Sequence, residues 1–520
     1  MKNINRRNFI KNAGLGAMLP MFLDKHNLLS YGNISESLMA TDNVLVVIQL
    51  SGGNDGLNTV IPINQYSKYK AARSNIAIAE DKLLKIPQTD TIGLNPGLLE
   101  FSQMMAEGKG AIVQDVGYPN PNFSHFVATD IWNTASSSNN IAESGWGGRY
   151  LSLEHPNFPQ GYPNTKFPDP LAIQIGSVVT TALQGPIYNM GMSISDPTNF
   201  YQLLSNAVEP TPNTLAGKEL SYLREISKQT NKYGESIKAA ALKVTQQQTY
   251  PNQSLASQLK IVARLIGGGL KTKIYYVRLG GFDTHSNQVD ATDTSIGAHT
   301  NLWKNISSSI KAFQDDLKFL GVADKVLGMT YSEFGRRVMS NASSGTDHGA
   351  AAPMFFFGNK VSADYFGKAT PLPDVSRAGD NVTMQYDFRS VYASILENWF
   401  CVDSNQLKDI LFQNFQSLQL VDPSVCGKVL SNEPVSTASR LNAFPNPVID
   451  NATFSFESKG GHCMLQIFNM RGIEVSKPVD DNYDQGKHEI SVPFHGFAQG
   501  TYMVRFQNNV YQEIKKVVKL

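Results

Sequence analysis

The sequence predicts an α/β protein with a mainly parallel sheet and helices on both faces, followed by a small all-β sandwich. Between residues 44 and 400, apolar β-branched runs alternate with helical segments, an alternation typical of a parallel sheet. From residue 443 on, only short alternating strands separated by Asn, Gly and Pro turns remain. The length of 520 residues exceeds that of one ordinary core.

The predicted strands share a short apolar run that ends at a turn, and the predicted helices share an apolar stripe at helical spacing. The strands are expected at 44–50, 110–116, 171–175, 273–279, 326–330 and 353–358. The helices are expected after Ser124 and at 144–151, 214–249, 255–270, 301–320 and 387–400.

The composition excludes some classes of function. The net charge is +1, which gives no electrostatic basis for binding nucleic acid. Three cysteines are too few for a disulfide framework, although Cys401 and Cys426 can pair if the chain is exported. Distance along the chain does not tell whether these two thiols meet.

The N-terminus is predicted to be a targeting segment. Arg6 and Arg7 precede an apolar stretch at 13–23, which is too short and too glycine-broken to span a bilayer. The segment resembles a twin-arginine signal, which implies that a translocase exports the folded chain. The alternative is an amphipathic helix of the fold. The predicted divisions are a leader at 1–40, an α/β domain at 41–426, a linker at 427–442 and a β-sandwich at 443–520.

Three strand ends carry metal-binding residue types. Asp55 follows the first strand, Asp283 and His285 follow the 273–279 strand, and Asp347 and His348 follow the 326–330 strand. The carboxyl ends of parallel strands meet at one sheet edge. Carboxylate with imidazole suits zinc, manganese or iron(II), and calcium or magnesium are further candidates for the divalent ion. The alternative is a set of turns capped by aspartates.

Further residues are candidates for the same site. Glu333 follows the 326–330 strand directly and is expected at the rim of the metal site. Ser124 precedes a predicted helix and is either a nucleophile or the helix N-cap. Arg336 or Arg149 could hold an anion through two parallel hydrogen bonds, and Arg149 could equally be a structural ion-pair partner.

The C-terminal segment resembles the type IX secretion sorting domain. The residues that carry the resemblance are Phe444-Pro-Asn-Pro447, Ile467-Phe468-Asn-Met-Arg-Gly472, Gly500-Thr-Tyr-Met503 and the lysine-containing end. The resemblance implies that the secretion machinery recognises residues 443–520 and moves the chain from the periplasm across an outer membrane to the cell surface or medium.

Residues from about 40 to 425 resemble an uncharacterised family of exported bacterial proteins with an alkaline-phosphatase-like fold. The motifs GGNDGLN, SHF, GFDTH, SEFGR and DHG occur in that order. The resemblance implies that Asp55, Asp283, His285 and the Asp347-His348 pair are metal ligands, and that Ser124 lies where a nucleophile can lie.

One departure concerns a further metal histidine, which the enzymes of that superfamily carry after the Asp-His pair. Here the only later histidines, His462, His488 and His495, fall in the sorting domain. The candidates to replace it are Glu333, His299 and Asp387, and the alternative is a site that binds a single ion.

Three functions follow as hypotheses. The first is a metal-dependent hydrolase of phosphate or sulfate esters, acting on a small anionic ester or a glycan. The second is a serine esterase that uses Ser51 or Ser124 with a histidine. The third is a catalytically silent secreted binding protein on the same fold.

Overall fold

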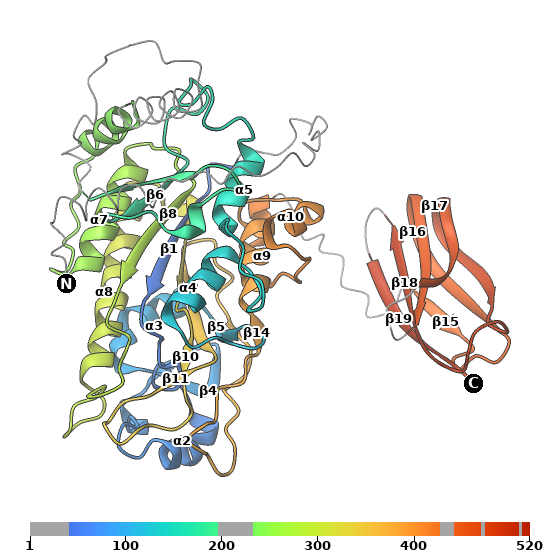
Figure 1. Cartoon of the computed structure of the whole chain (residues 1–520), viewed down its shortest axis with the longest axis horizontal. Helices are drawn as coiled ribbons and strands as arrows, with labels where there is room; N and C mark the ends of the chain where they lie inside the picture. The colour runs from blue at the N-terminus through green and yellow to red at the C-terminus, as the bar shows by residue number, and fades with distance from the viewer. Residues whose placement is uncertain (1–40, 196–231, 427–440, 470–473, 509–511) are drawn as a thin grey trace, which may run out of the picture. The chain divides into compact units, whose positions relative to one another are not determined.

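The computed structural model describes residues 41–195, 232–426, 441–469, 474–508 and 512–520 (Figure 1). Two compact units, Met1–Lys428 and Val429–Leu520, divide the chain. The predicted leader with Arg6 and Arg7, and all but the last two residues of the predicted linker, lie outside the described residues. Within the described part, no helix combines the length and apolarity that a bilayer span requires.

A nine-stranded sheet forms the centre of the first unit. Its order is β13-β5-β12-β9-β1-β8-β6-β7, and β14 also pairs with β5. The central strand β1 (Val44–Leu50) runs parallel to both neighbours, β8 (Ile274–Leu279) and β9 (Val326–Tyr331). A strand paired on both edges and covered on both faces must be apolar throughout, which explains its continuous apolar sequence.

The remaining strands of this sheet complete it on either side. They are β5 (Gly110–Gly117), β6 (Ala172–Ile175), β7 (Gly191–Ile194), β12 (Ala352–Phe357), β13 (Tyr365–Phe366) and β14 (Tyr386–Asp387). Only β12 runs against its neighbours, because it pairs antiparallel with both β5 and β9. The predicted fold class, a mainly parallel sheet, is confirmed.

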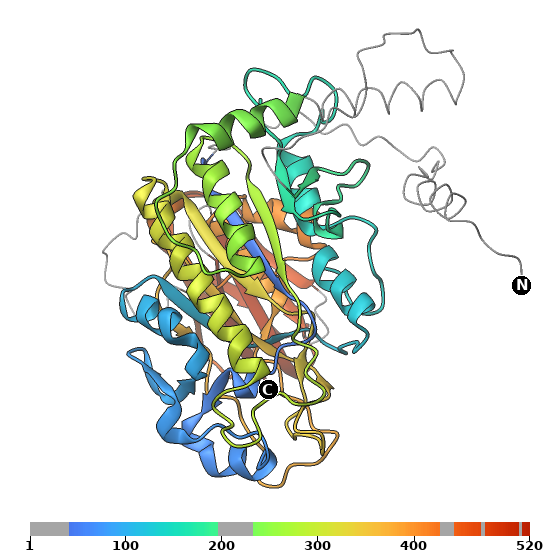
Figure 2. The same ribbon diagram turned by 90° about the vertical axis from the view of Figure 1, so that its left-hand side faces the viewer.

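Helices cover both faces of the sheet (Figures 1 and 2). Val46 and Ile48 of β1 belong to the core on one side, and Leu45 and Val47 belong to the core on the other. The first side is covered by α3 (Leu99–Ala106), α7 (Ser254–Gly267) and α8 (Ala298–Phe319). The second side is covered by α4 (His125–Thr134), α5 (Trp146–Glu154), α9 (Phe388–Asn398) and α10 (Leu407–Leu411).

Aromatic stacking fixes α4 beside the end of β9. The Trp132 ring of α4 stacks on Tyr331, the last residue of β9, with centroids 5.5 Å apart, and on Phe388 of α9 at 4.4 Å. Each such pair adds about 0.5–1.5 kcal/mol beyond the area it buries. The N-terminus of α4 is thereby held near the carboxyl edge of the sheet.

Short elements between residues 56 and 98 had no sequence prediction. Strands β2 (Val60–Pro62), β3 (Leu84–Ile86) and β4 (Thr89–Leu94) form a separate three-stranded sheet, and α2 (Tyr66–Ala72) lies between them in sequence. Two-residue strands β10 (Gly335–Arg336) and β11 (His348–Gly349) pair antiparallel. Segments this short carry too few residues to show a period.

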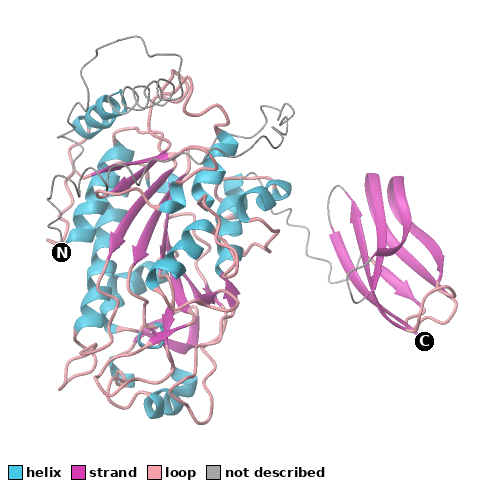
Figure 3. Ribbon diagram, in the orientation of Figure 1, coloured by secondary structure: helices cyan, strands magenta, loops and turns pink. Residues whose placement is uncertain are grey.

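The second unit is entirely β in its described residues, as predicted (Figure 3). Its strands are β15 (Asn442–Phe444), β16 (Asn451–Asn469), β17 (Glu474–Pro493), β18 (Gly500–Asn508) and β19 (Gln512–Lys519). They form one hydrogen-bonded sheet rather than the two separate sheets of a sandwich. One end of β16 pairs with β15 and the other with β18, and Gly460 and Gly461 have positive φ between the two ends. Strand β16 therefore belongs to both parts of one sheet.

A disulfide joins Cys401, just after α9, to Cys426, the last described residue of the first unit. We expect Cys401→Ser to lower the free energy of unfolding of this unit by about 3 kcal/mol, because the bridge restricts a closed loop of about 26 residues in the unfolded chain. Urea unfolding of the oxidised protein measures this. The Cys401→Ser/Cys426→Ser variant should fall no further, and reduction of the wild type should reproduce the loss. An unchanged midpoint after reduction would contradict the expectation.

Candidate functional site

The loops that follow β1, β8 and β9 converge at the carboxyl edge of the sheet. Gly52 follows β1 and has φ +126°, and a Cβ on it would lie 2.3 Å from the backbone nitrogen of Asp283, after β8. A Cβ on Gly345, in the loop after β9, would lie 2.3 Å from the backbone of His285. Glycine is required at both positions because the loop backbones touch.

The buried guanidinium of Arg336 holds these loops together. Its Nε donates to the Gly53 carbonyl at 2.7 Å, and its Nη1 donates to the Thr346 carbonyl at 2.7 Å. Its Nη2 donates to the carbonyls of Gly52 and Phe282 and, at 2.7 Å, to Oδ1 of Asp283. The expected role of Arg336 in holding a substrate anion is corrected, because its donors are engaged inside the protein.

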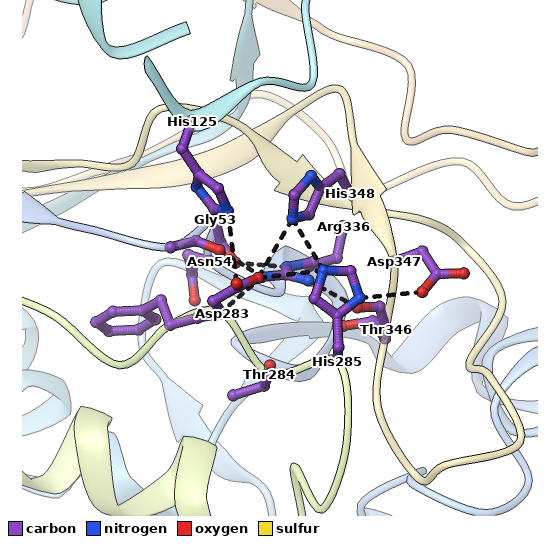
Figure 4. Close-up of polar contacts among 12 residues, drawn as sticks. Gly53, Asn54, His125, Asp283, Thr284, His285, Arg336, Thr346, Asp347 and His348 are labelled. Carbon is purple, nitrogen blue, oxygen red and sulfur yellow. Dashed lines mark hydrogen bonds and ion pairs between the residues drawn. The ribbon is translucent and has the colours of Figure 1, made fainter. Parts of the chain in front are cut away.

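Asp283 is the centre of a cluster of three imidazoles (Figure 4). Its Oδ1 lies 3.2 Å from Nε2 of His285 and 3.2 Å from Nε2 of His348, and its Oδ2 lies 3.5 Å from Nε2 of His125. The Nε2 atoms of His285 and His348 are 2.9 Å apart. Four potential ligand atoms therefore converge from the loops after β8 and β9 and from α4.

The outer nitrogen of each imidazole has an acceptor. Nδ1 of His348 lies 2.8 Å from the carbonyl oxygen of Phe123, and Nδ1 of His285 lies 3.2 Å from Oδ1 of Asp347. Nδ1 of His125 lies 2.8 Å from Oε1 of Glu333. A carbonyl or carboxylate can only accept, so each Nδ1 is placed to donate its proton outward, and each Nε2 faces the carboxylate of Asp283.

Imidazole nitrogens that converge on one carboxylate at these spacings are a donor set that a divalent cation could use. Ligands 2.0–2.1 Å from a common zinc ion at tetrahedral angles lie about 3.3 Å apart, close to the spacings in this cluster. Within the described residues, His125, Asp283 and His348 form the group whose ligand atoms all lie within 4.8 Å of one another. The Nε2 atom of His285 also lies close to Oδ1 of Asp283 and to Nε2 of His348. The residues fit a divalent metal with imidazole and carboxylate ligands.

The pKa shifts agree with this arrangement. Burial raises the pKa of the Asp283 carboxyl, but hydrogen bonds from Arg336 and His348 outweigh it and hold the pKa below the ordinary value. Burial is the largest cause that lowers the pKa of His348. Asp283 is thus favoured as the carboxylate and His348 as the neutral imidazole, and these are the forms that bind metal.

Glu333 and Asp347 contact ligand imidazoles instead of the cluster centre, which corrects their predicted role as direct ligands. Glu333 is buried, and its Oε1 also accepts the Gly52 amide at 2.8 Å. Asp347 Oδ1 also accepts from the side chain of Asn341 at 3.2 Å. Carboxylates of this kind fix the ring orientation and the tautomer of a metal-binding histidine.

Asp55 makes a different contact from the one predicted. Its two carboxylate oxygens accept from Nη1 of Arg73 at 2.8 and 2.6 Å, and both side chains are fully buried. Gln288 also donates to Oδ2 of Asp55 at 2.6 Å, and its own Oε1 accepts from the hydroxyls of Thr284 and Thr346. Asp55 therefore braces the residues adjacent to Asp283 and Asp347, and its predicted role as a ligand is corrected.

Two of the other predicted site residues are structural. Arg149 on α5 is buried and donates to the backbone carbonyls of Ser144, Thr134 and Ile410, so its predicted role in holding an anion is corrected. Burial lowers the pKa of His299 to about 4, and its Nε2 lies 3.0 Å from Oδ1 of Asn54, away from the three imidazoles.

Two further candidates lie at helix starts. Asp387 caps α9 by accepting from the Arg389 amide at 2.9 Å. Ser124 occupies the N-cap position of α4 without a capping bond from its side chain, and it is exposed. It directly precedes His125, so Ser124 is the sequence neighbour of one imidazole of the cluster.

His125 is the site residue that sequence reasoning missed. It begins α4, one residue after the candidate nucleophile, and does not follow any of the three strand ends directly. The available signal was the position of SHF at the end of the loop that follows β5. His125 supplies the third imidazole that the sequence lacks after His348.

Two segments of the chain match known families. Residues 211–401 match the family described as "Protein of unknown function (DUF1501)", and residues 442–520 match the "Secretion system C-terminal sorting domain". The second match confirms the predicted sorting domain, so the chain is an exported protein. No curated protein matches the chain.

Solved structures that resemble the chain come from the alkaline phosphatase superfamily, as the motifs predicted. A superfamily protein from Vibrio parahaemolyticus is 8% identical, with 92% of this chain and 83% of that chain covered and a TM-score of 0.34. The phosphonate monoester hydrolase SpPMH from Silicibacter pomeroyi is 9% identical (91% and 88% covered, TM-score 0.33). The PsFucS1 sulfatase from Pseudoalteromonas sp. is 8% identical (87% and 84% covered, TM-score 0.32). Likenesses this low carry no conclusion about activity.

Replacing a ligand and replacing its orienting carboxylate should weaken metal binding to different degrees. We expect Asp347→Asn to lower zinc affinity about 10–100-fold, because it acts only through His285. His348→Ala should lose more, because a ligand atom disappears. Competition with a chromogenic chelator measures both. The control is His462→Ala in the second unit, whose Nε2 also faces a carboxylate at 3.1 Å. Wild-type affinity in His348→Ala would contradict this assignment.

Asp55→Asn tests the structural role of that carboxylate. We expect the free energy of unfolding to fall by about 3–5 kcal/mol, because the buried Arg73 guanidinium loses its charged partner. The loss should be equal in chelator and in zinc, as measured by urea unfolding under both conditions. A loss seen only in zinc would instead make Asp55 a ligand.

Proposed function

We propose that this exported protein is a metal-dependent hydrolase of phosphate or sulfate esters. The observation that carries the proposal is the convergence of three imidazole Nε2 atoms on the carboxylate of Asp283. A divalent cation bound there would polarise an ester oxygen and stabilise the departing alkoxide. The ligand loops are held by Arg336 before any substrate arrives, which is the preorganisation that electrostatic catalysis requires.

The residues around the cluster have distinct roles in this proposal. His125, His285 and His348 would present their Nε2 atoms to the ion, and Glu333 and Asp347 would orient two of these rings through the outer nitrogens. Ser124, exposed at the start of α4, is the candidate nucleophile, and a water molecule is the alternative.

A catalytically silent binding protein is the second candidate. The observation in its favour is that Arg336 and Arg149, the arginines expected to hold an anion, are engaged with backbone carbonyls.

The esterase alternative has less support. It needs a serine bonded to a histidine, whereas Ser51 Oγ instead accepts from Nη2 of Arg278 at 2.6 Å.

Turnover of aryl phosphates and aryl sulfates by the zinc- or manganese-loaded protein tests the proposal. We expect Asp283→Asn to reduce kcat/KM at least about 100-fold, because the common partner of the three imidazoles loses its charge. Chelator should remove activity, and added metal should restore it. The control is Asp480→Asn, which removes a carboxylate that faces a histidine in the second unit.

Three outcomes separate the alternatives. Activity that survives the chelator and reacts with a fluorophosphonate probe indicates a serine esterase. Stoichiometric metal without turnover of any ester indicates the silent binding protein. Absence of both metal and turnover contradicts the metal centre itself.

A further inference from the structure

Arg278 is an exposed cation on a strand that is otherwise buried. It is the fifth residue of β8, and the other five residues of that strand are buried. The alternation of side chains places Arg278 on the same face of the sheet as Tyr276, whose ring belongs to the core beneath α4 and α5. Among the described residues, Arg278 forms no ion pair with a carboxylate. Its exposure therefore has no explanation in charge pairing.

The backbone of Arg278 is held by hydrogen bonds on the edge of β8 that faces β6. Beyond Tyr276 the neighbouring strand β6 no longer pairs with β8. The side-chain amide of Gln258 on α7 replaces it, accepting from the Arg278 amide at 3.0 Å and donating to the Arg278 carbonyl at 2.9 Å. The strand edge is thereby satisfied, and the residue is presented in a defined position.

The guanidinium of Arg278 is fixed as well, through Ser51. Its Nη2 donates to Ser51 Oγ at 2.6 Å. One bond uses one of five N–H donors, so the fork that binds phosphate or sulfate through two parallel bonds remains available. An arginine whose orientation is set before binding loses less entropy when it binds an anion.

Ser51 connects this guanidinium to the metal cluster. The carbonyl of Ser51 accepts from the amide of Phe282, the residue before Asp283, at 3.2 Å. The next amide, that of Gly52, donates to Glu333, which holds His125. Arg278 is therefore linked through Ser51 to the residue before Asp283, and through the neighbouring Gly52 to the carboxylate that contacts His125. It lies on the face of the sheet that α4 covers.

We propose that Arg278, oriented by Ser51, binds the anionic group of the substrate at the rim of the metal cluster. The inference rests on the proposed function and deepens it, since it identifies the recognised chemistry as a tetrahedral oxyanion. Arg278 takes the part that the sequence had given to Arg336 and Arg149. It is a binding residue for the substrate, and no bond is made or broken at it.

Binding of inorganic phosphate and of inorganic sulfate, each measured by calorimetry, tests the proposal. We expect Arg278→Gln to weaken binding of at least one anion about 10-fold or more, because a hydrogen bond to a charged group is lost. Arg278→Lys should recover part of the affinity. Arg377→Gln, which removes another exposed arginine, is the matched control and should bind like the wild type. Circular dichroism verifies that each variant is folded.

Each result bears on the inference. Affinity of Arg278→Gln within about 2-fold of the wild type, or no binding of either anion by the wild type, overturns it. In turnover, Arg278→Gln should raise KM for an aryl phosphate or sulfate more than for the neutral aryl acetate. Anion binding that depends on Arg278 without turnover by the wild type keeps this inference and rejects hydrolysis. Turnover by the wild type with an unchanged KM in Arg278→Gln keeps hydrolysis and rejects this inference.

Discussion

The buried guanidinium of Arg336 is the interaction on which the site depends. Its donors bind four backbone carbonyls from the loops that follow β1, β8 and β9, as well as the carboxylate of Asp283. No other side chain type offers five donors in one rigid plane. Because the three loops close around one group, the ligands they carry are placed relative to one another before any ion or substrate binds.

The sheet and the braces behind the loops serve the same end. Parallel strands β1, β8 and β9 deliver their carboxyl ends to one edge. Stacking of Trp132 on Tyr331 then brings the start of α4, and with it His125, to that edge. The buried Asp55–Arg73 pair and Gln288 support the loops from behind. The fourth residue of the cluster thus comes from the start of a helix, which explains how the cluster forms without a later histidine of the first unit.

The strands and long helices were predictable because their apolar periods are strong. All six expected strands occur in the structure, and three of the candidate ligands found in sequence, Asp283, His285 and His348, lie together in the cluster. The partners of the charged groups were not predictable. Whether Asp55 meets a metal or Arg73, and whether Arg336 meets an anion or carbonyls, depends on contacts between residues far apart in the chain, such as Arg336 and Gly53. His125 was missed for the same reason.

Charge balance is an argument for the proposed divalent cation. The contacts that join the three imidazoles include the carboxylates of Asp283, Glu333 and Asp347 and the single guanidinium of Arg336, a formal net charge of −2 with neutral rings. Burying part of this charge without compensation is costly, most of all for Glu333, whose side chain is 1% exposed. Protons on the carboxylates or on the imidazoles would reduce this charge, but a proton on an inward nitrogen would occupy the lone pair that a metal uses. A divalent ion would compensate the charge and use those lone pairs at once. In the proposed site, the ion would neutralise the carboxylates, and Arg278 would then be available to the substrate anion.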